Sequence, residues 1–303
     1  MIKSPRTSRF VAALAATCLL GLTACGSVSS SSDAFSVNKT GYSQDDFNKL
    51  SEALISLGQF TAVDGKMKGE DAVNILRTLV RYEAFLQFIE ENDVKILESD
   101  RAAVLKNASA DQNFSTYPKL LQDVLVNLNI ADVTLSKMTP PAIGKIETLY
   151  SASPASAGVL CLSHILVKTE AEAKTVLADL KSGAKFADVA AKKSIEPGAD
   201  KSGGALANGD EPCQALTDLQ TSFDKDFMTG AVAAKPGVPT GPVKSSFGYH
   251  IILSAPFADV KDSVATVIAK TPGNTLLAGY MSKAEIKVSS TYGVWNGATA
   301  TIS

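Results

Sequence analysis

Two short apolar runs, each carrying one of the only two histidines, constrain the fold of this chain more than any other feature. The first run covers residues 159–168 and contains His164, and the second covers residues 241–253 and contains His250. Both runs are rich in β-branched and aliphatic residues, which is typical of buried strands. The sequence therefore predicts two histidine-bearing strands that begin and end one stretch of the fold.

Helices fill the space between these strands. Thr169, with Glu172 three residues later, forms a capping box, and Gly183 is a good stop for the helix that it begins. Further along, Phe223 and Phe227 are four residues apart, so on a helix they would share one face.

This order of motifs resembles the parvulin family of peptidyl-prolyl cis-trans isomerases over about a third of the chain. The histidine strand at 162–167, a Gly-x-x-Phe helix at 183–190 and the Phe-Gly-Tyr-His-Ile-Ile ending at 247–252 carry the resemblance. The glycine turn departs from the family pattern, because Ala205 replaces an aspartate and Ala207 replaces a glycine. The resemblance implies an α+β fold in which helices surround an antiparallel sheet.

The same resemblance implies a pocket that binds the proline ring of a substrate. Leu206, Phe223 and Phe227 match the pocket positions, and Phe247 matches a further substrate-binding position. The alternative for the two pocket phenylalanines is an ordinary place in the core.

Four polar residues match the family's catalytic positions: His164, His250, Ser245 and Glu196. The histidines either polarise the surroundings of the twisting amide or form a hydrogen-bonded pair that fixes two strands. Glu196 stands where the family has cysteine or aspartate, so a covalent thiol mechanism is excluded at this position. Its carboxylate either disfavours the planar amide electrostatically or is a solvated loop acid.

The expected reaction needs neither a nucleophile nor a cofactor. Rotation about an Xaa-Pro bond meets a barrier of roughly 18–20 kcal/mol, because the C–N bond has partial double-bond character. A dry pocket that favours the twisted amide is sufficient, so we expect no cofactor. We expect no metal, because the cysteines and histidines lack close ligand spacing. The loop at 168–172 has one cation and two acids, which argues against phosphopeptide specificity.

The first residues resemble an export signal rather than part of the fold. Residues 1–24 contain three cations followed by a short apolar run, and the sequence then reaches Cys25 in a motif that resembles the lipobox of bacterial lipoproteins. Acyl chains on Cys25 would anchor the protein to a bacterial membrane on its extracytoplasmic side. The alternatives are an ordinary secretory signal and an uncleaved anchor.

Charge and cysteine usage agree with an exported protein. Removal of residues 1–24 takes away three cations and no acids, so the formal net charge moves from −2 to −5. Such a chain has no basic stripe for nucleic acid. Cys161 and Cys213 are the pair that remains, and we expect a disulfide between them, with two separate buried thiols as the alternative.

Composition divides the remaining chain into consecutive parts. A mainly helical segment in the first half resembles the N-terminal chaperone domain of SurA- and PrsA-like foldases, with an ordinary helical bundle as the alternative. We expect residues 280–296 to return and pair with residues 34–60, a loose tail being the alternative. The predicted parts are a tether at 25–33, a helical domain at 34–138, a linker at 139–158, a parvulin domain at 159–256 and a returning C-terminal segment at 257–303.

The sequence thus favours a membrane-tethered prolyl isomerase and foldase that acts on unfolded exported proteins with Xaa-Pro bonds. The main alternative is a non-catalytic holdase chaperone with a degenerate parvulin domain, for which Ala205 and Ala207 are the reason. A third hypothesis is a lipoprotein that binds small solutes.

Overall fold

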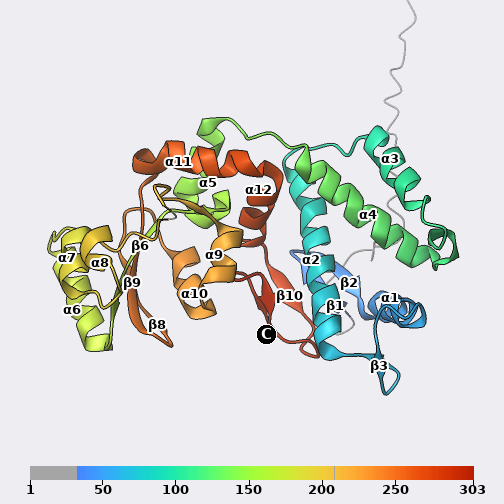
Figure 1. Ribbon diagram of the computed structural model, residues 1–303, viewed down its shortest axis with the longest axis horizontal. Coiled ribbons are helices and arrows are strands. Elements are labelled where there is room, and N and C mark those ends of the chain that lie inside the picture. The colour runs from blue at the N-terminus through green and yellow to red at the C-terminus, as the bar shows by residue number, and fades with distance from the viewer. Residues whose placement is uncertain (1–32, 208) are drawn as a thin grey trace, which may run out of the picture.

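The computed structural model describes residues 33–207 and 209–303. The predicted signal segment at 1–24, the lipidation site at Cys25 and nearly all of the tether lie outside these residues. Figure 1 shows an elongated molecule with a helical part at one end and a parvulin-like part at the other. The helices α5 (Ile143–Ala152), α11 (Phe257–Lys270) and α12 (Pro272–Met281) lie between the two ends.

The helical part is built on one long central helix, α2 (Gly69–Glu91). Its buried side chains include Leu76, Val80 and Phe85, which form the centre of the largest apolar cluster together with residues from β1 and α4. The other elements of this part are β1 (Asp33–Val37), β2 (Thr40–Ser43), α1 (Gln44–Ser56), β3 (Ala62–Val63), β4 (Lys66–Met67), α3 (Glu98–Ala108), η1 (Phe114–Thr116) and α4 (Lys119–Ser136).

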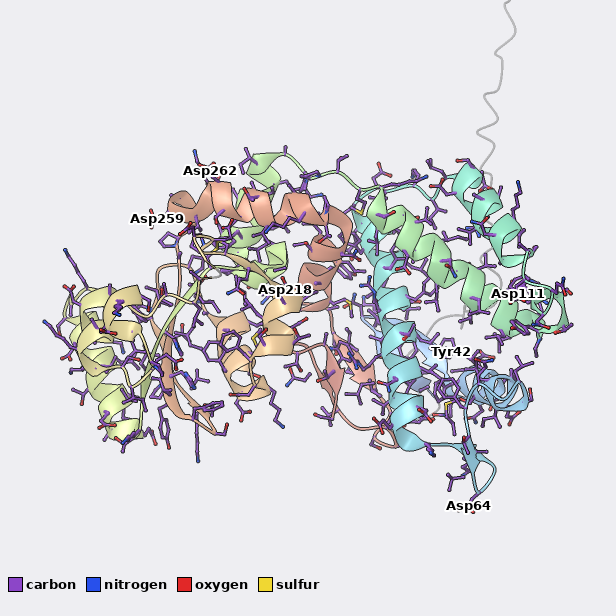
Figure 2. All side chains as sticks on the ribbon, viewed as in Figure 1. Tyr42, Asp64, Asp111, Asp218, Asp259 and Asp262 are labelled. Atoms are coloured by element: carbon purple, nitrogen blue, oxygen red, sulfur yellow. A yellow bond between two sulfur atoms is a disulfide. The ribbon has the colours of Figure 1, made fainter. Side chains whose placement is uncertain are left out.

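The sequence signals for these helices are met by local hydrogen bonds. The hydroxyl of Ser43 accepts from the backbone N–H of Asp46 and so caps α1. Tyr42, labelled in Figure 2, lies just before this cap and is buried. Its ring stacks on that of Phe35, with ring centroids 5.2 Å apart. The first strands and α1 are thereby fixed to the same core as α2.

The end of the chain returns to this helical part. The strand β10 (Ile286–Val288) pairs antiparallel with β1, with Phe35 opposite Val288. The resulting sheet has the order β10-β1-β2. The strand pairing predicted between residues 280–296 and 34–60 is therefore present. Just before it, α12 (Pro272–Met281) contributes Leu276 and Leu277 to the core around α2.

The parvulin-like part has a three-stranded antiparallel sheet with the order β6-β9-β8. The prediction of an α+β fold with helices around an antiparallel sheet is confirmed. Its strands are β6 (Leu162–Val167), β8 (Thr240–Ser245) and β9 (Gly248–Ser254), and its helices are α6 (Glu170–Lys181), α7 (Phe186–Lys193), α8 (Ala199–Ser202), α9 (Leu216–Ser222) and α10 (Lys225–Ala233).

The capping box predicted before α6 is present. The hydroxyl of Thr169 accepts from the N–H of Glu172, whose carboxylate accepts in return from the N–H of Thr169. Gly183, one residue beyond the C-cap, has a φ of 97°, a left-handed conformation that glycine adopts without steric cost. The helix therefore begins and ends where the sequence indicates.

The stretch predicted as a linker, 139–158, is mostly folded, and part of it is buried. It contains α5 (Ile143–Ala152) and η2 (Pro154–Ala157). Tyr150 is fully buried, and its hydroxyl donates to the carbonyl oxygen of Ala255 at 3.0 Å. The residues rich in proline, alanine and serine lie at the two ends of the stretch, whereas Ile146, Leu149 and Tyr150 between them form the apolar face of α5.

The C-terminal segment is also not a single unit that packs on the helical part. Its first helix, α11 (Phe257–Lys270), packs on α5 and on the cluster around Cys161 and Cys213. Asp259 and Asp262 lie on the outer face of α11, exposed to solvent (Figure 2). Only after Thr271 does the chain turn toward α2.

The short strands β5 (Val159–Leu160) and β7 (Gln214–Ala215) pair antiparallel beside the disulfide, and β11 (Trp295–Asn296) pairs with β12 (Thr301–Ile302) near the chain end.

Within residues 33–207 and 209–303, no helix is both long enough and apolar enough to cross a membrane.

Candidate functional site

The two histidines meet on one face of the β6–β9 pair. In the antiparallel register His164 lies opposite Ile252, and Leu166 lies opposite His250. The histidines are therefore diagonal neighbours two residues apart in register, and side chains so related share a face of the sheet. Their rings stack with centroids 5.4 Å apart, and the two Nδ1 atoms are 3.2 Å apart.

A chain of polar contacts extends from the histidine pair in both directions. The hydroxyl of Ser245 lies 2.7 Å from His250 Nε2, and it also accepts from the backbone N–H of Phe247 at 3.1 Å. On the other side, His164 Nε2 lies 3.7 Å from a carboxylate oxygen of Glu196. Ser245 and both histidines are buried, whereas Glu196 is partly exposed.

These contacts favour one set of tautomers. Ser245 already accepts from Phe247, so its hydroxyl hydrogen is available to His250 Nε2. Nδ1 of His250 then donates to Nδ1 of His164. This leaves the proton of His164 on Nε2, which faces the carboxylate of Glu196. The opposite arrangement would place a bare nitrogen lone pair against that carboxylate.

Burial keeps both imidazoles neutral. His164 is 3% exposed and His250 is 4% exposed. Desolvation lowers the pKa of His164 to about 4. For His250, desolvation together with the neighbouring His164 lowers the pKa to about 4, although Asp224 and Glu196 oppose the shift. At neutral pH the pair therefore carries no charge.

Glu196 is held in place by the end of a short extended segment. Ile195 donates its N–H to the carbonyl oxygen of Leu166 at 2.8 Å. The hydroxyl of Ser194 accepts from the N–H of Leu166 at 3.1 Å and from the N–H of Glu196 at 3.3 Å. Ser194 thus joins the segment to β6, a positioning role that the sequence analysis did not identify.

An aromatic pair lies beside the histidines. The rings of Phe223 and Phe227 stack with centroids 4.8 Å apart. Phe227 is 1% exposed and presents its ring in edge geometry to both imidazoles, at 5.7 Å from His164 and 5.1 Å from His250. Phe223 is half-buried and lies nearer the surface.

The helical explanation for this aromatic pair is wrong. Phe223 is the C-cap of α9 with extended backbone (φ −118°, ψ 153°), and Phe227 belongs to the following helix, α10. The chain turns at Asp224, whose carboxylate accepts from the N–H groups of Asp226 and Phe227 at 2.9 Å each. The phenylalanines therefore meet across a helix junction, and Asp224 is a further positioning residue that only its N-cap pattern could have indicated.

Helix α10 can place Phe227 at the histidines because it approaches the sheet closely. A Cβ atom on Gly230 would lie 2.5 Å from Cγ2 of Val243. Val243 is opposite His250 in the β8–β9 pair and packs in the same apolar cluster as Phe223 and Leu206. Val243 is thus a member of this apolar cluster that the sequence did not indicate.

The turn that carries Leu206 is fixed to β6 in spite of its alanines. His164 donates its N–H to the carbonyl oxygen of Gly204 at 2.8 Å, and Leu206 donates to Leu162 at 2.9 Å. Gly204 has a φ of 83°, and a Cβ there would lie 2.4 Å from the carbonyl oxygen of His164. The close contact requires a glycine at position 204, and this chain has one. The side chain of Ala205, which departs from the family pattern, is exposed.

The predicted disulfide is present between Cys161 and Cys213. It joins the residue before β6 to the residue before β7. Gln214, next to the bridge, donates its side-chain N–H to the carbonyl oxygen of Leu206 at 2.8 Å. The disulfide and this hydrogen bond together hold Leu206 beside Gln214.

Phe247 does not belong to the same apolar cluster. It lies in the turn between β8 and β9 with 69% of its surface exposed, and the apolar cluster around Phe227 does not include it. Its backbone N–H, rather than its ring, takes part in the polar chain through Ser245. The structure therefore brings together His164, His250, Ser245 and Glu196 with Leu206, Phe223 and Phe227, and leaves the ring of Phe247 outside.

The chemical capacity of this arrangement follows from its composition. The aromatic and aliphatic walls can hold an apolar ring, and the neutral imidazoles bring polarity without charge. A hydrogen-bonded serine and a carboxylate lie at the two ends. Such surroundings can offer a planar amide a drier environment than water, which favours the less charge-separated twisted form.

Comparison with known proteins agrees with this geometry. Residues 164–255 match the Rotamase family, the PPIC-type PPIase domain. Foldase protein PrsA of Clostridium kluyveri is 33% identical over 193 residues, which are 60% of this chain and 50% of that protein. The putative peptidyl-prolyl cis-trans isomerase Cbf2 of Campylobacter jejuni is 31% identical over 202 residues, 64% of each chain. NmPin, the parvulin of Nitrosopumilus maritimus, is 34% identical over 32% of this chain and 96% of that chain, with a TM-score of 0.28.

Residues 164–255 therefore form a parvulin-type peptidyl-prolyl isomerase domain. The similarity to PrsA covers 193 residues and so extends beyond that domain. The chain spans about half the length of the curated PrsA foldase that it matches.

Proposed function

We propose that this chain is an extracytoplasmic peptidyl-prolyl cis-trans isomerase and foldase for exported proteins. The observation that carries the proposal is the apolar cluster in which Phe223, Phe227 and Leu206 lie beside the buried pair His164 and His250. We infer that the proline ring binds at this cluster, and we call the binding place the parvulin hollow. The relatives named PrsA and Cbf2, a foldase and a putative isomerase, support the same function.

In this proposal the proline ring of an Xaa-Pro segment enters the hollow and stacks against Phe223 and Phe227. The dry walls lower the cost of twisting the amide, so no bond to the protein forms. The chain Ser245–His250–His164 keeps β6, β8 and β9 in register and holds the imidazoles neutral at the hollow. We assign the histidines this positioning role, and Glu196 the role of orienting His164.

The direct test is the exchange rate of an Ala-Pro peptide with the purified protein. Uncatalysed isomerisation takes tens to hundreds of seconds at 25 °C, so a catalysed rate is easily recognised. We expect clear acceleration, and loss of most of it in Phe227→Ala. An unaccelerated exchange with correctly folded protein would reject the proposal.

The holdase alternative has its own observation, the alanines at positions 205 and 207 of the turn. A refolding reaction limited by proline isomerisation separates the two functions. The isomerase shortens the slow phase at substoichiometric amounts. A holdase leaves the slow phase unchanged and suppresses aggregation only when it is present at amounts close to those of its client.

We also propose that a lipid on Cys25 anchors the protein, on the strength of the lipobox-like sequence that precedes it. The prediction is that the mature protein fractionates with membranes and that Cys25→Ser releases it. Mass spectrometry of the mature N-terminus is the matched readout. An N-terminus without an acyl chain on Cys25 would contradict the proposal.

A further inference from the structure

A second hollow lies far from the histidines, at the junction between the helical part and α5. It has a volume of about 650 Å³ and lies between the end of α2, the segment 138–141, α5 and α12. Figure 1 shows the chain crossing from α4 to α5 at this junction, above α2 and α12. None of the residues that form the parvulin hollow lines it.

This hollow continues into a neighbouring one of about 400 Å³. Val94, Met138 and Thr139 line both, so the two hollows adjoin, and we call them together the junction groove. Two adjoining hollows can receive successive side chains of an extended polypeptide, which advances by about 3.3 Å per residue.

The floor of the junction groove is apolar. At its far end Leu97 has 52% of its surface exposed, which is unusual for a leucine that lines a hollow and leaves apolar surface open to a ligand. Met138, near the middle, is an unbranched and adaptable side chain. The apolar side chains that line the first hollow are Phe88, Val94, Met138, Pro141, Leu149 and Leu276.

The rim of the junction groove is basic, although the chain as a whole has more acids than cations. Lys145 and Lys283 line the first hollow. Within residues 33–207 and 209–303 neither forms an ion pair, and the Nζ of Lys145 donates to the side-chain oxygen of Asn92 at 2.7 Å. The acid of the same hollow, Glu91, already accepts from the hydroxyl of Tyr280 at 3.0 Å.

The second hollow differs, because both of its lysines have acidic partners. It contains Lys95, Lys137 and Asp100. The Nζ of Lys137 lies 2.6 Å from the buried Asp100, and the Nζ of Lys95 lies 3.0 Å from Asp93. The positive charge that a ligand meets in the junction groove is therefore that of Lys145 and Lys283, at the end formed by the first hollow.

We propose that the junction groove binds extended polypeptide segments in which acidic side chains alternate with apolar ones. The apolar side chains occupy the floor, and the carboxylates lie against Lys145 and Lys283. This is a second client-binding site, separate from the parvulin hollow, and it needs no proline. It does not depend on isomerase activity, so its test can fail while the proposed function stands.

Binding of a fluorescein-labelled, proline-free peptide of alternating glutamate and leucine tests the proposal by anisotropy with the full chain. The variant Lys145→Glu/Lys283→Glu reverses the charge of the first hollow at two exposed positions, where folding is not at risk. We expect the acidic peptide to bind about tenfold more weakly to this variant, and a lysine-leucine peptide to bind more tightly.

The matched control is Lys261→Glu/Lys270→Glu, two exposed lysines of α11 outside the junction groove, with the same change in net charge. Binding to this control should stay within about twofold of the parent. Equal loss in both variants would show a general charge effect and overturn the proposal, as would unchanged binding in both. Exchange of the Ala-Pro peptide serves as the independent readout and should be equal in all three proteins.

Discussion

The parvulin hollow and the junction groove are surrounded by opposite kinds of side chain. The first has two buried, neutral imidazoles and a stacked aromatic pair. The second has exposed lysines around an apolar floor. Removal of water and charge favours the twisted form of an amide. A charged, solvent-exposed surface instead attracts an unfolded segment of opposite charge. In our proposal the first therefore carries the isomerisation and the second holds clients.

The strongest test of this difference between the two sites is to remove the aromatic ring at the centre of the parvulin hollow. Phe227→Ala should lower the free energy of unfolding by about 3–5 kcal/mol, because it empties a fully buried site, and should abolish most isomerase activity. Urea unfolding and peptide exchange measure the two effects. Phe247→Ala is the control, and its exposed ring predicts a stability change within about 0.5 kcal/mol. Full isomerase activity in folded Phe227→Ala would remove this residue from the mechanism.

Reduction of the disulfide should produce the next largest effect. Loss of the Cys161–Cys213 bridge is expected to cost about 2–4 kcal/mol, since it frees a long loop in the unfolded chain. It should also slow isomerisation, because the segment after Leu206 loses its attachment. The measurement compares urea unfolding with and without reductant. A Cys161→Ser/Cys213→Ser variant should not respond to reductant, and an identical response in both proteins would refute the prediction.

The pH dependence of stability tests the neutrality of the histidine pair. In the folded protein both pKa values are lowered to about 4, below the ordinary value of 6.5. Between these values the unfolded state binds more protons than the folded state, so the free energy of unfolding rises with pH. The contribution of the neutral His164 and His250 to the free energy of unfolding is fully present above pH 6.5. It is lost as the pH falls toward 4.

Urea unfolding at pH 7 and pH 5 measures this contribution. The His164→Asn/His250→Asn variant should lose less stability between the two pH values than the parent does, since its remaining carboxylates titrate alike. A parent and a variant with the same pH dependence would mean that the imidazoles are not held neutral by burial.

The smallest effect is expected at Glu196. The carboxylate of Glu196 raises the pKa of His250. Glu196→Gln removes this carboxylate, so the pKa of His250 should fall further. Because Glu196 is partly exposed, we expect isomerase activity to change by less than about tenfold. Nitrogen NMR of the histidines checks whether His164 keeps its proton on Nε2, with Glu170→Gln as a distant control. Complete loss of activity would instead make Glu196 a catalytic residue.

Local sequence signals predicted local structure well. The capping box at Thr169 and the strand character around His164 and His250 depend on neighbouring residues, so they could be recognised without the fold. The family motifs likewise indicated which side chains would gather. The meeting of Phe223 and Phe227 was foreseen, but for the wrong reason, because the break at Asp224 outweighs their spacing.

Features that depend on long-range packing could not be predicted in the same way. The burial of Tyr150 depends on Ala255 and α11, which lie about a hundred residues further along. Gly230 shows its importance only when Val243 lies against it. The junction groove needs α2, α5 and α12 together, so no single stretch of sequence predicted it.

The most direct test of the central claim is the exchange rate of an Ala-Pro peptide with the parent protein and with Phe223→Ala, whose half-buried ring can be removed with less damage to folding. The account predicts clear acceleration by the parent, loss of most of it in the variant, and closely similar thermal unfolding of the two proteins. Equal acceleration by both, or none by the parent, would contradict it.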